Sequence, residues 1–92
     1  MIKILDVSVA GDFELRVAFS TGVEGLFDGR ALLARSGPLL ETLRDSAYFA
    51  RAFVDAGGVC WPNGLELSAA RVLEQCRVLQ GFDQGNRLRG GQ

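Results

Sequence analysis

Alternation of apolar and polar residues is clearest in the first third of the chain. From Phe13 to Ser20 nearly every second residue is a large apolar one, the pattern of a strand with one buried face. The preceding segment, Ile2 to Val9, is also rich in β-branched residues, but its apolar phase slips between Ile4 and Leu5. Such a slip predicts either a strand covered on both faces or a β-bulge. Val23 to Asp28 is the third expected strand, and the short connections favour an antiparallel meander.

After residue 29 the pattern changes and predicts short helices. Pro38 opens a leucine-rich helical turn, since proline is favoured at the first helical position. Asp45 is placed to cap a second short helix from Ser46 to Arg51. Apolar segments on both sides of Ala56-Gly57-Gly58 then predict a hairpin whose second strand ends at Trp61.

A helix is expected at the C-terminal end, from Ser68 as its N-cap to Gln80, with Gly81 just after it. Five apolar residues would share one face of this helix: Ala69, Val72, Leu73, Cys76 and Leu79. The expected fold is therefore α+β: an antiparallel β meander, short helices, a β hairpin and a C-terminal helix (β-β-β-α-β-β-α). Residues 1–83 are expected to form a single domain, and residues 84–92, which show no period, a flexible C-terminal tail.

Composition and charge narrow the function classes. Nonspecific binding to nucleic acids requires an excess of basic residues, and the chain has a net charge of −1. Direct nucleic-acid binding is therefore not expected. No apolar stretch approaches the about 20 residues of a transmembrane helix, and no signal peptide precedes the first strand. We therefore expect no membrane association, and a location in the cytoplasm.

Residues able to carry out catalysis are sparse. The chain has no histidine, which removes the usual activation of serine or cysteine nucleophiles and the commonest metal ligand. Cys60 and Cys76 fit buried free thiols better than a disulfide framework. Carboxylates are scattered through turns and strand ends. We expect neither a cofactor nor a metal, and an enzyme that uses carboxylates such as Asp45 and Asp55 is the least favoured of three hypotheses.

The stretch Trp61-Pro62-Asn63-Gly64 is the candidate binding site. Pro62 stops the preceding strand, and Asn63 and Gly64 suit a tight turn. Tryptophan is enriched at binding hot spots, so Trp61 is a candidate anchor for a partner, and the amide of Asn63 a candidate ligand contact. The alternative is purely structural, with Trp61 in the core at a strand end and Asn63-Gly64 as an ordinary turn.

The order of these segments resembles a small bacterial family, the domain of unknown function 2442, over roughly residues 1 to 74. Three segments carry the resemblance: Val23-Glu24-Gly25-Leu26-Phe27-Asp28, Leu43-Arg44-Asp45-Ser46-Ala47-Tyr48-Phe49-Ala50, and Trp61-Pro62-Asn63-Gly64 with the following Leu65-Glu66-Leu67. The resemblance implies a compact cytosolic α+β domain, found alone or fused to a helix-turn-helix domain, and no established catalytic residues. It also implies a gene often placed beside another small protein, as in toxin–antitoxin pairs. After Leu67 family members often carry an acidic, proline-containing stretch, whereas this chain has the pattern of a longer helix.

The leading hypothesis is a noncatalytic protein-interaction or regulatory module of a bacterial cytosolic system, such as one half of a toxin–antitoxin-like pair. The alternative is a small-molecule-sensing regulatory domain with a pocket near Trp61 and Asn63. We expect a homodimer, because a small domain with an open sheet leaves apolar surface and a sheet edge to protect. Val78 and Phe82 are the expected interface residues, and a small protein from a neighbouring gene is a second candidate partner.

Overall fold

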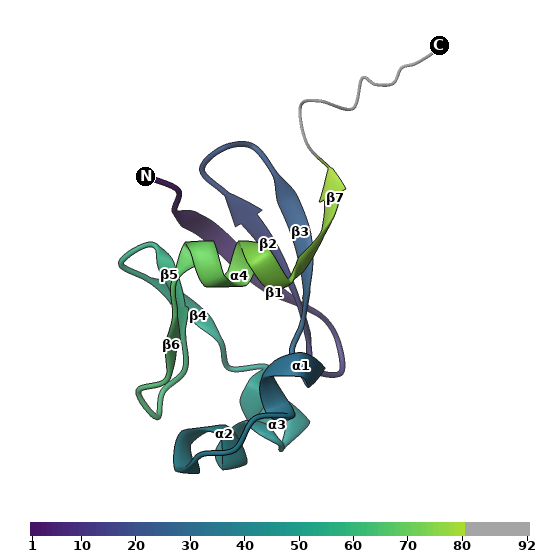
Figure 1. Ribbon diagram of the computed structural model, residues 1–92, viewed down its shortest axis with the longest axis vertical. Coiled ribbons are helices and arrows are strands. Elements are labelled where there is room, and N and C mark those ends of the chain that lie inside the picture. Colours follow the sequence, from purple (N-terminus) through teal and green to yellow (C-terminus); the bar gives the residue numbers. More distant parts are fainter. Residues whose placement is uncertain (81–92) are drawn as a thin grey trace.

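The computed structural model describes residues 1–80 and confirms the α+β class, with two antiparallel sheets and four short helices (Figure 1). The first sheet has the order β1-β2-β3-β7 and consists of β1 (Ile4–Gly11), β2 (Glu14–Phe19), β3 (Glu24–Asp28) and β7 (Cys76–Gln80). The second has the order β4-β5-β6 and consists of β4 (Phe53–Asp55), β5 (Gly58–Cys60) and β6 (Glu66–Leu67). The helices are α1 (Arg30–Leu33), α2 (Pro38–Leu43), α3 (Ser46–Phe49) and α4 (Ala69–Gln75). The expected tail, residues 84–92, lies outside the described residues, as do Gly81 and Phe82.

The β-bulge alternative for the first strand is confirmed. The register of β1 against β2 shifts between Ile4 and Asp6, which leaves Leu5 as the extra residue. Because of this shift, Ile4 and Val7 both face the core although they are three positions apart, and Leu5 is 63% exposed. The predicted hairpins, Pro38 at the start of α2 and the Asp45 cap of α3 are also present.

The prediction of a C-terminal helix from Ser68 to Gln80 is wrong in its second half. Ser68 does cap α4, since its Oγ accepts a hydrogen bond from the backbone N–H of Arg71 at 3.2 Å. The helix ends at Gln75, however, and the chain continues without a loop as β7, antiparallel to β3. Cys76 and Val78 fit the period of two of a strand, whereas Cys76 and Leu79 fit one helical face, and the open edge of β3 supplies the partner that decides between the two periods.

One hydrophobic core lies between the sheets and the helices, and Figure 1 shows α4 across the four-stranded sheet with α1, α2 and α3 grouped at one end. At that end three aromatic rings form a row, in which Phe49 stands between Phe13 and Trp61. The centroid of the Phe49 ring is 5.6 Å from that of Phe13 and 5.6 Å from that of Trp61. This row connects the β1–β2 turn with the turn that follows β5.

Candidate functional site

The sequence-predicted site begins with Trp61, which the structure places in the core. Its side chain is only 1% exposed, and its Nε1–H donates a hydrogen bond to the carbonyl oxygen of Phe49 at 2.9 Å. The apolar ring and the polar N–H are therefore both satisfied inside the domain. This is the structural alternative for Trp61, and it leaves the indole almost no surface for direct contact with a partner.

Asn63 holds the turn after Trp61 against α2. Its Nδ2 donates to the carbonyl oxygen of Leu39 at 3.0 Å, and its Oδ1 accepts from the backbone N–H of Leu65 at 3.1 Å. Gly64 has a φ of 97°, in the region that favours glycine, and its N–H donates to the carbonyl oxygen of Trp61 at 3.0 Å. Pro62 lies exposed between them. The four residues are thus neighbours, and the amide groups of Asn63 already have partners within the chain.

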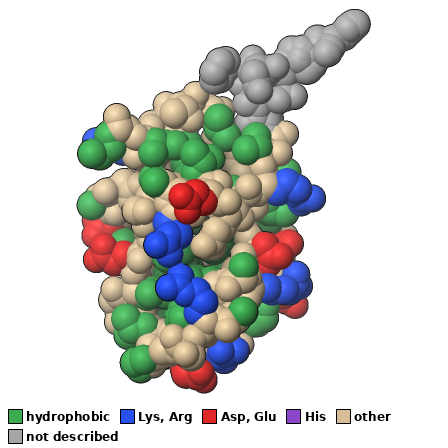
Figure 2. Space-filling view, viewed as in Figure 1, with side chains coloured by type: hydrophobic (Ala, Val, Ile, Leu, Met, Phe, Trp, Pro, Cys, Tyr) green, Lys and Arg blue, Asp and Glu red, His purple; other side chains and the backbone are tan. Residues whose placement is uncertain are grey.

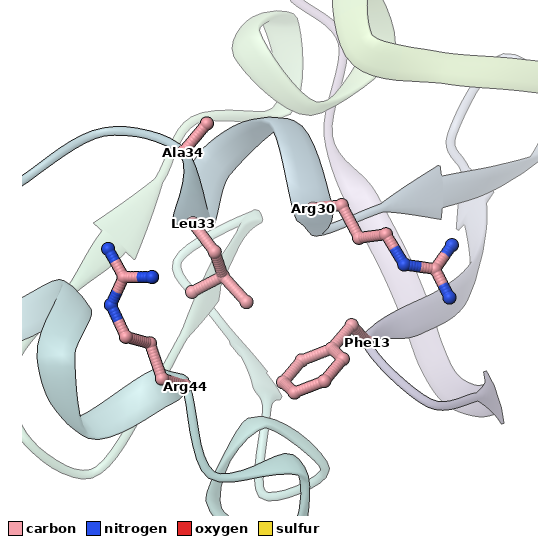
Figure 3. Close-up of a pocket in the computed structure, with 5 residues that line it drawn as sticks. All are labelled: Phe13, Arg30, Leu33, Ala34 and Arg44. Carbon is pink, nitrogen blue, oxygen red and sulfur yellow. The ribbon is translucent and has the colours of Figure 1, made fainter.

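A hollow lined by other residues lies between the β1–β2 turn, α1 and the end of α2 (Figure 3). It has a volume of about 370 Å³ and is lined by Phe13, Arg30, Leu33, Ala34 and Arg44. In Figure 3 the side chains of Phe13 and Leu33 occupy the middle, while the guanidinium groups of Arg30 and Arg44 lie on opposite sides. We call this the arginine-flanked hollow. Its chemistry is an apolar centre between two cations.

The arginine-flanked hollow could not be predicted from the sequence because its residues come from three separate segments. The local signal was Phe13, which occupies a turn position where glycine or asparagine is the usual residue. Its φ is 59°, in the left-handed region that bulky residues rarely adopt. The sequence pattern placed Phe13 at the start of the second strand, whereas the structure places it in the turn before β2.

The other exposed apolar feature is β7, at the edge of the first sheet. Val78 is 52% exposed and Leu79 is 42% exposed, and as successive strand residues they point to opposite faces. β1 forms the opposite edge of the sheet, where Leu5 and Val9 are also exposed. Of the two expected interface residues, Val78 is therefore accessible, although on a strand rather than on a helix, and Phe82 is not described.

Comparison with protein families matches residues 4–78 to the family described as protein of unknown function (DUF2442). The chain belongs to this family. The DUF2442 match ends at residue 78, whereas the resemblance in the sequence was expected to end near residue 74. It therefore continues past Leu67 and includes α4 and the first three residues of β7. No curated protein and no solved structure matches the chain.

The carboxylates that the enzyme hypothesis invoked in this DUF2442 domain have local structural positions. Asp45 caps α3, where its Oδ1 accepts from the backbone N–H of Ala47 at 3.0 Å, and Asp55 is the last residue of β4. Within residues 1–80 no group of three or more carboxylate, thiol or imidazole side chains is arranged to hold a metal ion. None of the helices in that range has the length and apolar character needed to cross a membrane.

The two thiols of the DUF2442 domain are free, and the protein environment disfavours their ionisation. Burial raises the pKa of the Cys76 thiol from 9.0 to about 11. For Cys60, burial and then the nearby carboxylates of Glu66 and Asp55 raise the pKa of the thiol. Since the thiolate is the reactive form, both cysteines are poor nucleophiles near neutral pH.

Cys76 is therefore expected to react with iodoacetamide at pH 8 about one hundred times more slowly in the folded protein than in urea, because a pKa raised by two units leaves about one hundredth of the thiolate. The folded state holds this proton more tightly. Protonated Cys76 therefore contributes to the stability of the folded state. This contribution is complete below pH 9.0 and is lost as the pH rises toward about 11. Peptide mapping by mass spectrometry measures each site. Equal rates in the folded and unfolded protein would contradict the expectation.

Proposed function

We propose that this protein is a noncatalytic protein-interaction module that self-associates through β7 and acts in the bacterial cytoplasm. The observation that carries the proposal is the edge of the first sheet. β7 pairs with β3 on one side, and no other strand of the described residues pairs with its second side. An edge that combines free backbone groups with exposed Val78 and Leu79 favours pairing with another strand.

A two-fold arrangement fits this edge. If two β7 strands pair antiparallel around Val78, the two four-stranded sheets join into one continuous sheet, with the two copies of Val78 opposite each other. Figure 2 shows hydrophobic side chains across the upper part of the molecule, the part in which Figure 1 shows β7. A symmetric contact there would remove part of this apolar surface from water, and a small partner protein could use the same edge by the same strand addition.

The protein is expected to sediment at about twice its 9.9 kDa monomer mass at micromolar concentration. Val78→Glu should shift it to monomer, because like charges directly opposite each other in an antiparallel pair are destabilising. Leu39→Glu is the matched control, since Leu39 is 41% exposed on α2, away from the first sheet, and this variant should stay dimeric. Sedimentation equilibrium measures all three. A parent protein that sediments as a single 9.9 kDa species rules out self-association.

The alternative, a small-molecule-sensing domain with a pocket near Trp61 and Asn63, has less support. The indole is 1% exposed, and both polar atoms of the Asn63 amide are hydrogen-bonded within the chain. Native mass spectrometry of the purified protein distinguishes the two. A stoichiometric copurified small molecule would favour sensing, and a second protein chain would favour the interaction module.

A further inference from the structure

We infer that the arginine-flanked hollow binds an extended acidic peptide segment of a partner protein, in which one apolar side chain is flanked by carboxylates. This inference goes beyond self-association and concerns a different surface. The hollow lies beside α1 and α2, whereas β7 forms the edge of the first sheet. The two proposals can therefore succeed or fail independently.

The centre of the hollow suits one apolar side chain. Phe13 and Leu33 form this part, and Phe13 rests edge-on against Phe49, with an angle of 71° between the ring planes. The packing fixes the Phe13 ring as a firm apolar wall. A volume of about 370 Å³ is near the lower end for ligand pockets, which run from about 300 to 1,000 Å³. A single bulky side chain therefore fits better than a large organic ligand.

The two arginines keep unused hydrogen-bonding capacity toward an anion. Nε of Arg44 lies 3.3 Å from Oε2 of Glu41, and its Nη2 donates to the carbonyl oxygen of Arg35 at 3.4 Å. Nη1 of Arg30 lies 3.8 Å from Oδ2 of Asp28, beyond hydrogen-bond distance. Both side chains are well exposed, at 65% for Arg30 and 47% for Arg44. Each guanidinium carries five N–H donors in a planar fork that matches a carboxylate.

The backbone of the β1–β2 turn sets the position of the Phe13 ring. The Phe13 φ of 59° is a rare conformation for a bulky aromatic residue, and Ala56 in the β4–β5 turn has a similar φ of 51°. The carbonyl oxygen of Phe13 accepts a hydrogen bond from the N–H of Gly29 at 2.7 Å, which ties the turn to the start of α1. This bond holds the strained residue beside Arg30 and Leu33, where its ring lines the hollow.

The positions of the arginines define the pattern of the occupant. In an extended peptide alternate side chains point to the same side, so residues two positions before and after the apolar residue face the protein with it. The guanidinium groups of Arg30 and Arg44 lie on opposite sides of the apolar centre (Figure 3). The expected partner sequence is thus acidic–any–apolar–any–acidic. Opposite charge favours such a segment over a neutral or basic one.

The probe is a fluorescein-labelled peptide, Gly-Glu-Ser-Phe-Ser-Glu-Gly, with both ends blocked so that they carry no charge. Fluorescence anisotropy with the full chain should show saturable binding that weakens as salt is added. Replacing both glutamates of the peptide by glutamine, or its phenylalanine by alanine, should weaken binding at least about tenfold in each case. Absence of saturable binding by the parent peptide overturns the inference, as does equal binding of the glutamine peptide.

Protein variants locate the site. Arg30→Gln and Arg44→Gln should each raise the Kd for the acidic peptide about tenfold. Arg71→Gln removes an exposed arginine on α4, outside the hollow, and should leave the Kd unchanged. Circular dichroism checks that each variant is folded. A folded Arg30→Gln/Arg44→Gln double variant that binds as tightly as the parent overturns the inference. Displacement of the peptide by phenylacetate at an equal concentration would assign the hollow to small carboxylates instead, and would also overturn it.

Discussion

Replacing Trp61 with alanine is expected to lower the free energy of unfolding by about 3–5 kcal/mol, the usual cost of emptying a buried aromatic site. The side chain is 1% exposed, and its ring packs 5.6 Å from that of Phe49, measured between centroids. The substitution also removes the shorter of two hydrogen bonds to the Phe49 carbonyl oxygen, the one at 2.9 Å, and leaves that oxygen only the backbone N–H of Ala52 at 3.3 Å. Urea denaturation of the parent and the variant measures the difference.

Two further variants separate the causes of this loss. Trp61→Phe keeps an aromatic ring but removes the donor, and its cost should be smaller than that of alanine, about 1–3 kcal/mol. Phe53→Ala is the surface control, because Phe53 is 44% exposed and its truncation should cost much less than that of Trp61. Coincident urea midpoints for Trp61→Ala and the parent would refute the core assignment.

Gly29→Ala is expected to destabilise the fold by about 1–3 kcal/mol through overpacking. A Cβ at this position would overlap Cε2 and Cζ of Phe49 and lie 3.0 Å from the carbonyl oxygen of Phe13. The φ of Gly29 is −73°, an ordinary helical value, so the backbone itself tolerates alanine. Without the clash the substitution would stabilise by about 0.4–1 kcal/mol, because alanine restricts the unfolded chain. The sign of the effect therefore reports on packing against Phe49.

A double-mutant cycle checks this reason. In a Phe49→Leu background the smaller side chain relieves the overlap, so Gly29→Ala should cost clearly less there than in the parent. Thermal or urea unfolding of the four proteins supplies the coupling energy. Equal costs in the two backgrounds would show that the Phe49 ring is not the obstacle.

The first 67 residues were largely predictable because local signals there agree with tertiary packing. The alternation through β2 matches a sheet with one face in the core, and the phase slip after Ile4 marks the bulge. Asp45, and Ser68 just after this stretch, cap helices as their sequence positions indicate. In each case the deciding partner lies within a few residues or in the adjacent strand, so the sequence carries the information.

The end of α4 and the arginine-flanked hollow depend on distant partners. From Cys76 onward the apolar residues fit both a helix and a strand, and pairing with β3, about fifty residues earlier, decides for the strand. The hollow likewise requires Phe13, Arg30 and Arg44 to meet. For Trp61 the sequence left a core and a binding interpretation open, and the core position follows from packing against α3 rather than from the turn itself.

The row of rings from Phe13 through Phe49 to Trp61 also provides a built-in optical probe. Trp61 is the only tryptophan in the chain. Protein fluorescence excited at the long-wavelength edge of the absorption band therefore comes from one buried indole. Phe13 lines the hollow at one end of the row, and Phe49 touches the indole at the other. One ring, that of Phe49, thus separates the Phe13 side chain from the fluorophore. We therefore expect the emission of the unlabelled protein to follow unfolding, and to change on binding at the hollow if the Phe13 ring shifts, without any added dye.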